Sequence, residues 1–149
     1  MEKEFVPYKQ ALALKELGFD EPCAACYGSY THKTSELFLN INNPVNIETL
    51  VREKTGFNRP TFYVKSPTFS QVFRWFKEKY KLMSCITPCS DGEYIFTLYD
   101  LNKCDLEVFV EDIEIMESED SYEFFEEAEL ECLKKLIEIV KISHKTATL

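Results

Sequence analysis

Two pairs of closely spaced cysteines carry the most recognisable chemistry in this chain. They are Cys23 with Cys26 and Cys85 with Cys89. Four thiolates brought together can bind a zinc ion. A chelating pair needs a tight turn, however, whereas residues 23–30 are small and apolar enough for a buried strand, in which residues three apart face opposite sides. We therefore expect reduced thiols and no metal, and a zinc site formed by these four cysteines is the alternative.

A hydrolase built on a cysteine or a serine needs a histidine base, and the chain offers His32 and His144. We expect His32 in a loop after a strand and His144 in a C-terminal tail. The sequence has no Gly-x-Ser-x-Gly motif, and no two glycines are close enough to form a phosphate-binding loop. Catalysis by Cys26 with His32 stays open, because such a site is defined by spatial geometry. The sequence favours a non-catalytic protein without a cofactor over an enzyme.

A run of acidic residues between positions 111 and 127 is the main candidate for a binding surface. Regularly spaced acids can imitate a phosphate backbone and bind a cationic groove of a partner protein. The simpler alternative is a solvated helix start, with charges that suit the helix dipole. The candidate protein-binding residues are Glu111, Asp112, Glu114, Glu117, Glu119, Asp120 and Glu123, to which Trp75 is added.

Trp75 belongs to segment 66–80, which has the pattern of an amphipathic helix. We expect Ser66 to cap this helix and Pro67 to take its first position. At roughly 100° per residue, Trp75 projects about 120° from the centre of the apolar arc. Packing at the margin of the core is the favoured interpretation of Trp75, and anchoring a partner protein is the alternative. The arc itself consists of Phe69, Val72, Phe73, Phe76 and Tyr80.

The bulk properties bound the function. The chain has 149 residues, 45% of them hydrophobic, which suffices for the core of a single domain. Its net charge of −9 opposes direct binding to nucleic acid or to anionic membranes. No apolar run approaches the ~18 residues of a membrane span, and residues 1–5 lack the pattern of a signal peptide. We expect a cytoplasmic protein with reduced cysteines.

The first part of the chain alternates helical and strand patterns. The first helix ends at Gly18, a residue that suits a C-terminal cap. The expected elements are a helix over 8–17, strands over 23–30 and 37–39, a short helix that begins near Asn46, a strand over 61–65 and the helix over 66–80.

Beyond residue 80, alternation of apolar and polar residues predicts a hairpin with strands at 82–87 and 93–99, joined through an Asp-Gly turn. A further strand contains Leu106, Val108 and Val110, and Ile113 with Ile115 extends it after a bulge. The last helix begins near Asp120 or near Phe124 and reaches about Lys141, and residues 142–149 form a frayed tail. Its core stripe is Phe125, Ala128, Cys132, Leu133, Leu136, Ile137 and Val140.

These elements indicate an α+β fold and a single domain over 1–149, with residues 31–65 as a variable middle segment. We expect an antiparallel sheet of about three to five strands, with two or three amphipathic helices packed mainly on one face.

Residues 8–23, 67–80 and 126–141 together resemble a family of small uncharacterised proteins from gut Bacteroidales bacteria and their prophages and phages. The three blocks cover about a third of the chain. The resemblance implies an origin in a phage or another mobile element, and it implies no catalytic residue.

The sequence thus predicts a small acidic protein that acts by binding another protein, as an accessory or counter-defence factor of a mobile element. A partner with a basic surface would suit the acidic run. A protein that sequesters a small ligand, either zinc or a nucleotide, is the alternative, and an enzyme comes third.

Overall fold

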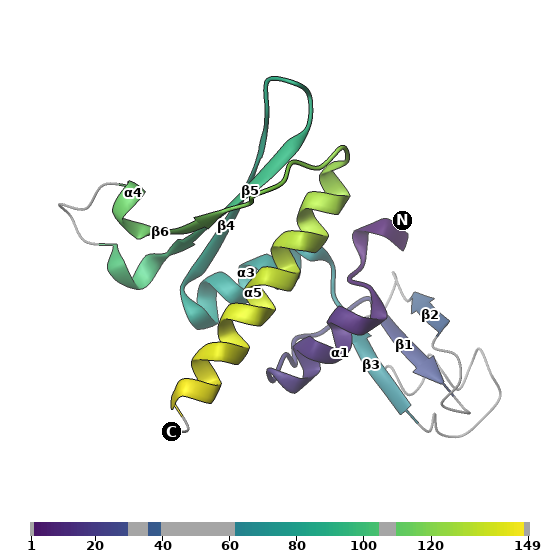
Figure 1. Ribbon diagram of the computed structural model, residues 1–149. Coiled ribbons are helices and arrows are strands. Elements are labelled where there is room, and N and C mark those ends of the chain that lie inside the picture. Colours follow the sequence, from purple (N-terminus) through teal and green to yellow (C-terminus); the bar gives the residue numbers. More distant parts are fainter. Residues whose placement is uncertain (1, 30–35, 40–61, 105–109, 148–149) are drawn as a thin grey trace. The chain divides into compact units, whose positions relative to one another are not determined.

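The computed structural model describes residues 2–29, 36–39, 62–104 and 110–147 (Figure 1). The chain divides into two compact units, Met1–Thr68 and Phe69–Leu149. Each unit combines helices with an antiparallel sheet, so the predicted α+β class is confirmed. The described strands form two sheets of three strands each. The predicted short helix near Asn46 lies outside the described residues.

In the first unit, β1 (Ala25–Ser29) is the central strand of its sheet. β2 (Glu36–Leu39) and β3 (Phe62–Ser66) pair with it on either side, both antiparallel. α1 (Tyr8–Glu16) lies against β3, and a short 3-10 turn, η1 (Glu2–Glu4), precedes it (Figure 1). The core of this unit contains buried side chains from the N-terminal segment, α1, β1 and β3, among them Val6, Leu14, Cys26 and Val64.

α1 ends as its sequence predicts. Gly18 has a φ of 84°, a left-handed conformation in which a side chain would be strained. The N–H of Gly18 donates to the carbonyl oxygen of Lys15, and the N–H of Phe19 donates to that of Leu14. These two bonds form a Schellman cap, which satisfies carbonyl groups that the end of the helix would otherwise leave open.

The start of the next helix differs from the prediction. α3 (Phe69–Tyr80) begins after Pro67, and Ser66 is the last residue of β3, opposite Ala25. Ser66 is fully buried, and its hydroxyl donates to the carbonyl oxygen of Val6 at 2.9 Å. The predicted capping role of Ser66 is therefore wrong, because this residue still pairs with β1 and its hydroxyl bonds to the N-terminal segment.

The second unit is built on the sheet β4-β5-β6, which is antiparallel throughout. α5 packs against β4 and β5, and α3 packs against both β4 and α5 (Figure 1). The buried core therefore lies between the sheet and these two helices. The strands of the second unit are β4 (Leu82–Pro88), β5 (Tyr94–Asp100) and β6 (Glu114–Glu117). Its helical elements besides α3 are η2 (Leu101–Lys103), α4 (Val110–Ile113) and α5 (Phe125–Ala147).

The predicted hairpin between β4 and β5 is confirmed. The N–H of Cys89 donates to the carbonyl oxygen of Glu93 at 2.7 Å and closes the turn. Gly92 sits inside it with a φ of 90°, which explains why a glycine follows Asp91. The carboxylate of Asp91 accepts a bond from the N–H of Glu93 at 3.1 Å.

The predictions for the chain between η2 and α5 are confirmed in part. β6 pairs with β5, so the predicted strand at Ile115 is confirmed. The bulge predicted between Val110 and Ile113 is wrong, because a register shift between Leu98 and Tyr99 instead leaves Ile115 itself without a partner residue. Val110 and Ile113 belong to α4, however, and not to a strand. Leu106 and Val108 lie outside the described residues.

α5 begins close to the later of its two predicted starts and continues past the predicted end at Lys141, since it is helical to Ala147. Its buried stripe from Ala128 to Val140 is confirmed. Phe125 is the exception, because it is the first residue of the helix and is 42% exposed. In the described part of the chain, none of the helices combines the length and the apolar composition that crossing a bilayer requires.

Candidate functional site

The acidic segment, which we define as residues 111–127, follows one edge of the second sheet from α4 to the first turn of α5. Its carboxylates come from a helix, a strand, a loop and a second helix, so no single helical face accounts for them. All of them are exposed: Glu111, Asp112, Glu114, Glu117, Glu119, Asp120, Glu123, Glu126 and Glu127. The structure thus brings every acidic candidate residue to the surface of one continuous segment.

Backbone pairing with β5 holds the middle of this segment. Glu117 lies opposite Thr97, and the N–H of Ser118 donates to the carbonyl oxygen of Phe96 at 2.8 Å. Tyr94 and Tyr122 exchange two further backbone bonds of 2.8 Å. The residues between these two attachment points, which include Glu119 and Asp120, form the loop that leads toward α5.

Three large apolar side chains are exposed within the same segment. Ile115 at the bulge is 39% exposed, Phe124 is 53% exposed and Phe125 is 42% exposed. The ring of Phe125 meets that of Tyr94 in an edge-to-face arrangement, with 5.5 Å between ring centres. The sequence interpretation missed this feature, since it assigned Phe125 to the core. The available signal was the presence of apolar residues inside a run that is otherwise acidic.

Three carboxylates in the middle of this segment form no ion pair with another described residue. They are those of Glu114, Glu117 and Glu119. The neighbouring lysines of α5 pair within their own helix, Lys134 with Glu131 at 2.5 Å and Lys135 with Glu138 at 2.9 Å. Farther along α5, burial raises the pKa of Glu129, and the charge of Glu126 raises it further. A positive partner would therefore meet Glu114, Glu117 and Glu119 without breaking an ion pair between described residues.

Trp75 lies in a different setting from the acidic segment. It is 6% exposed, and its ring meets those of Phe76 and Tyr80 edge-on, at 5.1 and 5.3 Å. The ammonium of Lys79 lies 4.8 Å from the ring centre. The buried side of α3 is rotated toward Trp75 relative to the predicted arc, because Phe73 and Tyr80 are only half-buried. These contacts favour packing over partner binding for Trp75.

The cysteine pairs are divided between the two units. Cys23 and Cys26 are buried in the first unit, whereas Cys85 is exposed and Cys89 half-buried in the second. Within the described ranges, no group of three or more His, Cys, Asp or Glu side chains could hold a metal ion. The zinc alternative therefore gains no support from the described geometry.

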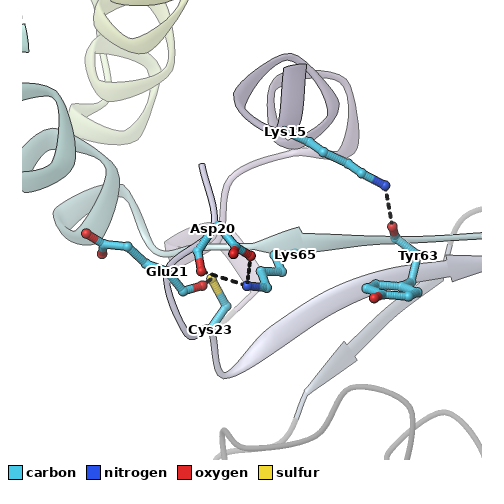
Figure 2. A network of polar contacts seen from close by, with 6 residues as sticks. All are labelled: Lys15, Asp20, Glu21, Cys23, Tyr63 and Lys65. Atoms are coloured by element: carbon cyan, nitrogen blue, oxygen red, sulfur yellow. Dashed lines mark hydrogen bonds and ion pairs between the residues drawn. The ribbon is translucent and has the colours of Figure 1, made fainter. Parts of the chain in front are cut away.

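The thiol of Cys23 lies in the polar network shown in Figure 2, where its Sγ donates to the carbonyl oxygen of Glu21 at 3.4 Å. Burial raises the pKa of Cys23 to about 12, although the positive charge of Lys65 partly opposes this. A thiol with such a pKa is protonated at neutral pH and is a poor nucleophile. Burial has the same effect on Cys132, which also has a pKa of about 12.

The rest of this network ties β3 to α1 and to the loop that follows it. The ammonium of Lys65 bonds to the carboxylate of Asp20, and that of Lys15 donates to the carbonyl oxygen of Tyr63 at 3.3 Å (Figure 2). The hydrogen bond and charge of Lys65 lower the pKa of Asp20. These contacts hold β3, α1 and the loop together and do not form a reactive site, because the carboxylate of Asp20 is ion-paired and the thiol of Cys23 is neutral.

Of the two histidines, the structure describes His144, which forms no catalytic arrangement with a described cysteine or serine in the contacts observed. His32 lies outside the described residues, so its pairing with Cys26 stays a hypothesis. His144 is exposed near the end of α5, with its ring 5.9 Å from that of Tyr80. No protein-family model, curated protein or solved structure matches the chain. The acidic segment, with its exposed apolar side chains, is the site that the geometry supports best.

Proposed function

We propose that this chain is a non-catalytic binding protein, and that its acidic segment engages a basic surface of a partner protein. One observation carries the proposal. The described residues include five exposed large apolar side chains, and three of them, Ile115, Phe124 and Phe125, lie within the acidic segment.

The combination matters because charge alone is the ordinary condition of a solvated surface. A segment that serves only solubility has no need of exposed phenylalanine, whose apolar surface is unfavourable in water. Exposed apolar side chains that are grouped and surrounded by charge are typical of protein interfaces. Phe124 and Phe125 would provide contact area, and the surrounding carboxylates would select the charge of the partner.

The electrostatics define the partner further. Exposed carboxylates repel nucleic acid and attract clustered lysine or arginine side chains. Attraction of this kind raises the association rate and weakens with added salt. The proposal leaves Trp75 out, since its ring is packed against its own helix. An accessory or counter-defence role for a phage or another mobile element is part of the proposal and rests on the resemblance of the sequence.

Charge reversal with affinity purification from a host lysate tests the proposal. The double variant Glu114→Lys and Glu117→Lys should lose the basic partners that the unmodified protein recovers. The double variant Glu4→Lys and Glu78→Lys is the matched control, because it makes the same change in net charge at exposed positions outside the segment. Equal recovery by both variants would show that the acidic segment is not the binding surface.

Phe124→Ser tests the apolar component separately. The variant keeps every charge, so its salt dependence should resemble that of the unmodified protein while its affinity falls. Recovery of the same partners with unchanged affinity would reduce the proposal to a purely electrostatic contact.

A further inference from the structure

β6 is the outermost strand of the second sheet among the described residues, which leaves one edge without a neighbouring strand. The strand is four residues long, Glu114–Glu117. An unpaired edge presents a row of backbone N–H and C=O groups, and these can pair with another extended chain.

The register shows which groups point outward. The N–H of Ser118 donates to the carbonyl oxygen of Phe96, and the N–H of Phe96 donates to the hydroxyl of Ser118, so these two residues face each other at a hydrogen-bonded position of the ladder. Hydrogen-bonded and non-hydrogen-bonded pairs alternate along an antiparallel ladder. The next pair, Glu117 with Thr97, is therefore non-hydrogen-bonded. Consequently, the N–H and C=O of Glu117 point away from β5, toward the open edge.

The side chains at this edge select what can pair with it. A second copy of β6 would place Glu114 and Glu117 opposite like charges, which is unfavourable across a strand pair. Lysine or arginine side chains on an added strand would instead face carboxylates. Ile115, which is 39% exposed at the bulge, offers an apolar contact in the middle of the edge.

We propose that β6 accepts an extended, lysine- or arginine-rich segment of a partner protein as a fourth strand of this sheet. Main-chain bonds to Glu117 give the segment its position, and the carboxylates of the acidic segment give it its charge preference. The inference rests on the proposed function, and it adds the conformation of the partner and the backbone groups that it uses.

A direct binding experiment with two labelled peptides tests the strand. The first probe is a fluorescein-labelled peptide of alternating lysine and valine, about eight residues long. The second has the same sequence with every interior backbone nitrogen methylated, which keeps the charges and removes the N–H donors. Fluorescence anisotropy at about 0.15 M salt should show a Kd at least ~10-fold larger for the methylated peptide, because that peptide loses one or more hydrogen bonds to the protein.

Two variants of Glu117 test the site on the protein. Glu117→Gln and Glu117→Pro both remove the carboxylate, but only the second removes the N–H. Proline is tolerated at a strand edge where the N–H faces outward. The unmethylated peptide should bind Glu117→Pro about 2- to 12-fold more weakly than Glu117→Gln. Circular dichroism and thermal melting confirm that both variants fold.

The outcomes separate this inference from the proposed function. Equal affinity for the two peptides, or for the two variants, overturns strand addition while leaving a charge-based acidic surface intact. Absence of measurable binding by either peptide also overturns strand addition, and the charge-reversal experiment then decides the proposed function alone. Weaker binding to the methylated peptide together with weaker binding by Glu117→Pro supports the fourth strand.

Discussion

Lys65 bonds twice to Asp20, a residue 45 positions earlier in the chain. Its ammonium lies 2.8 Å from the backbone carbonyl oxygen of Asp20 and 2.5 Å from a carboxylate oxygen. The side chain of Asp20 is almost fully exposed, so water screens most of the attraction. The backbone bond adds direction, because it fixes the loop after α1 against β3.

Asp20→Asn should lower stability at neutral pH but not in acid. Lys65 lowers the pKa of the folded Asp20, so the carboxylate stabilises the fold above the pKa of the unfolded chain. This contribution disappears as the pH falls through the folded pKa. Urea denaturation of both proteins across the acidic range measures it, with Glu78→Gln as a control at an exposed position. A deficit of Asp20→Asn that persists in strong acid would contradict the assignment.

Glu129→Gln should have the opposite effect on stability at neutral pH. Burial, and then the charge of Glu126, raise the pKa of the folded Glu129, so ionisation of this group destabilises the fold. The penalty is absent below the pKa of the unfolded chain and develops as the pH rises through the folded pKa. The variant should therefore be more stable than the unmodified protein at neutral pH and equal to it in acid. Thermal melting at both pH values checks this, with Glu127→Gln as the exposed control.

When the native protein is alkylated, the exposed thiols should react before the buried ones. Cys85 and Cys104 are exposed and should react first. Cys89 should follow, since desolvation and then the charge of Asp91 raise its pKa. Mass spectrometry of protein treated with iodoacetamide gives the order. Three cysteines should react only after unfolding: Cys23, Cys26 and Cys132.

The junction between α3 and β4 depends on an unusual backbone angle. Lys81 has a φ of 58°, and no other described non-glycine residue has a positive φ. Lys81→Gly should raise the free energy of unfolding by up to about 1 kcal/mol, because glycine adopts this conformation without strain. Lys81→Ile should lower it by about 1 kcal/mol or more. Lys77→Gly, inside α3, is the control and should be destabilising by about 1 kcal/mol.

Core and surface phenylalanines should respond differently to truncation. Phe76 is fully buried, so Phe76→Ala should cost about 3–5 kcal/mol of stability. Phe124→Ala should change stability by no more than about 0.5 kcal/mol, since the side chain is half exposed. Denaturant unfolding of both variants measures these costs. A large cost for Phe124→Ala would assign that ring to the core and weaken its role in binding.

Local signals account for the elements that sequence analysis placed correctly. Gly18 and Gly92 each mark a turn whose backbone requires a positive φ, and both the helix end and the hairpin follow from them. The spacing of apolar residues likewise predicts the buried stripe of α5. These features depend on neighbours within a few residues, so a single sequence is enough to find them.

The errors arise where distant parts of the chain compete for the same residue. Ser66 has the local character of a helix cap, but its backbone pairs with Ala25 and its hydroxyl bonds to Val6. The burial of Trp75 depends on how α3 is rotated about its axis, which helical spacing alone does not fix. The acidic residues 111–127 are exposed, as a run of charges predicts, and their role in binding stays a prediction. The exposure of Phe125 depends on the geometry of the helix start, which the spacing of apolar residues does not give.

The bulge in β6 also bears on how this chain can change in length. Ile115 is the residue in excess, since Met116 lies opposite Leu98 and Glu114 lies opposite Tyr99. Losing one residue here would leave both flanking pairs in register, whereas losing one elsewhere in β6 would turn the following side chains to the other face of the sheet. Deletion of Ile115 is therefore compatible with keeping the carboxylates of β6 on the same faces of the sheet that they occupy now.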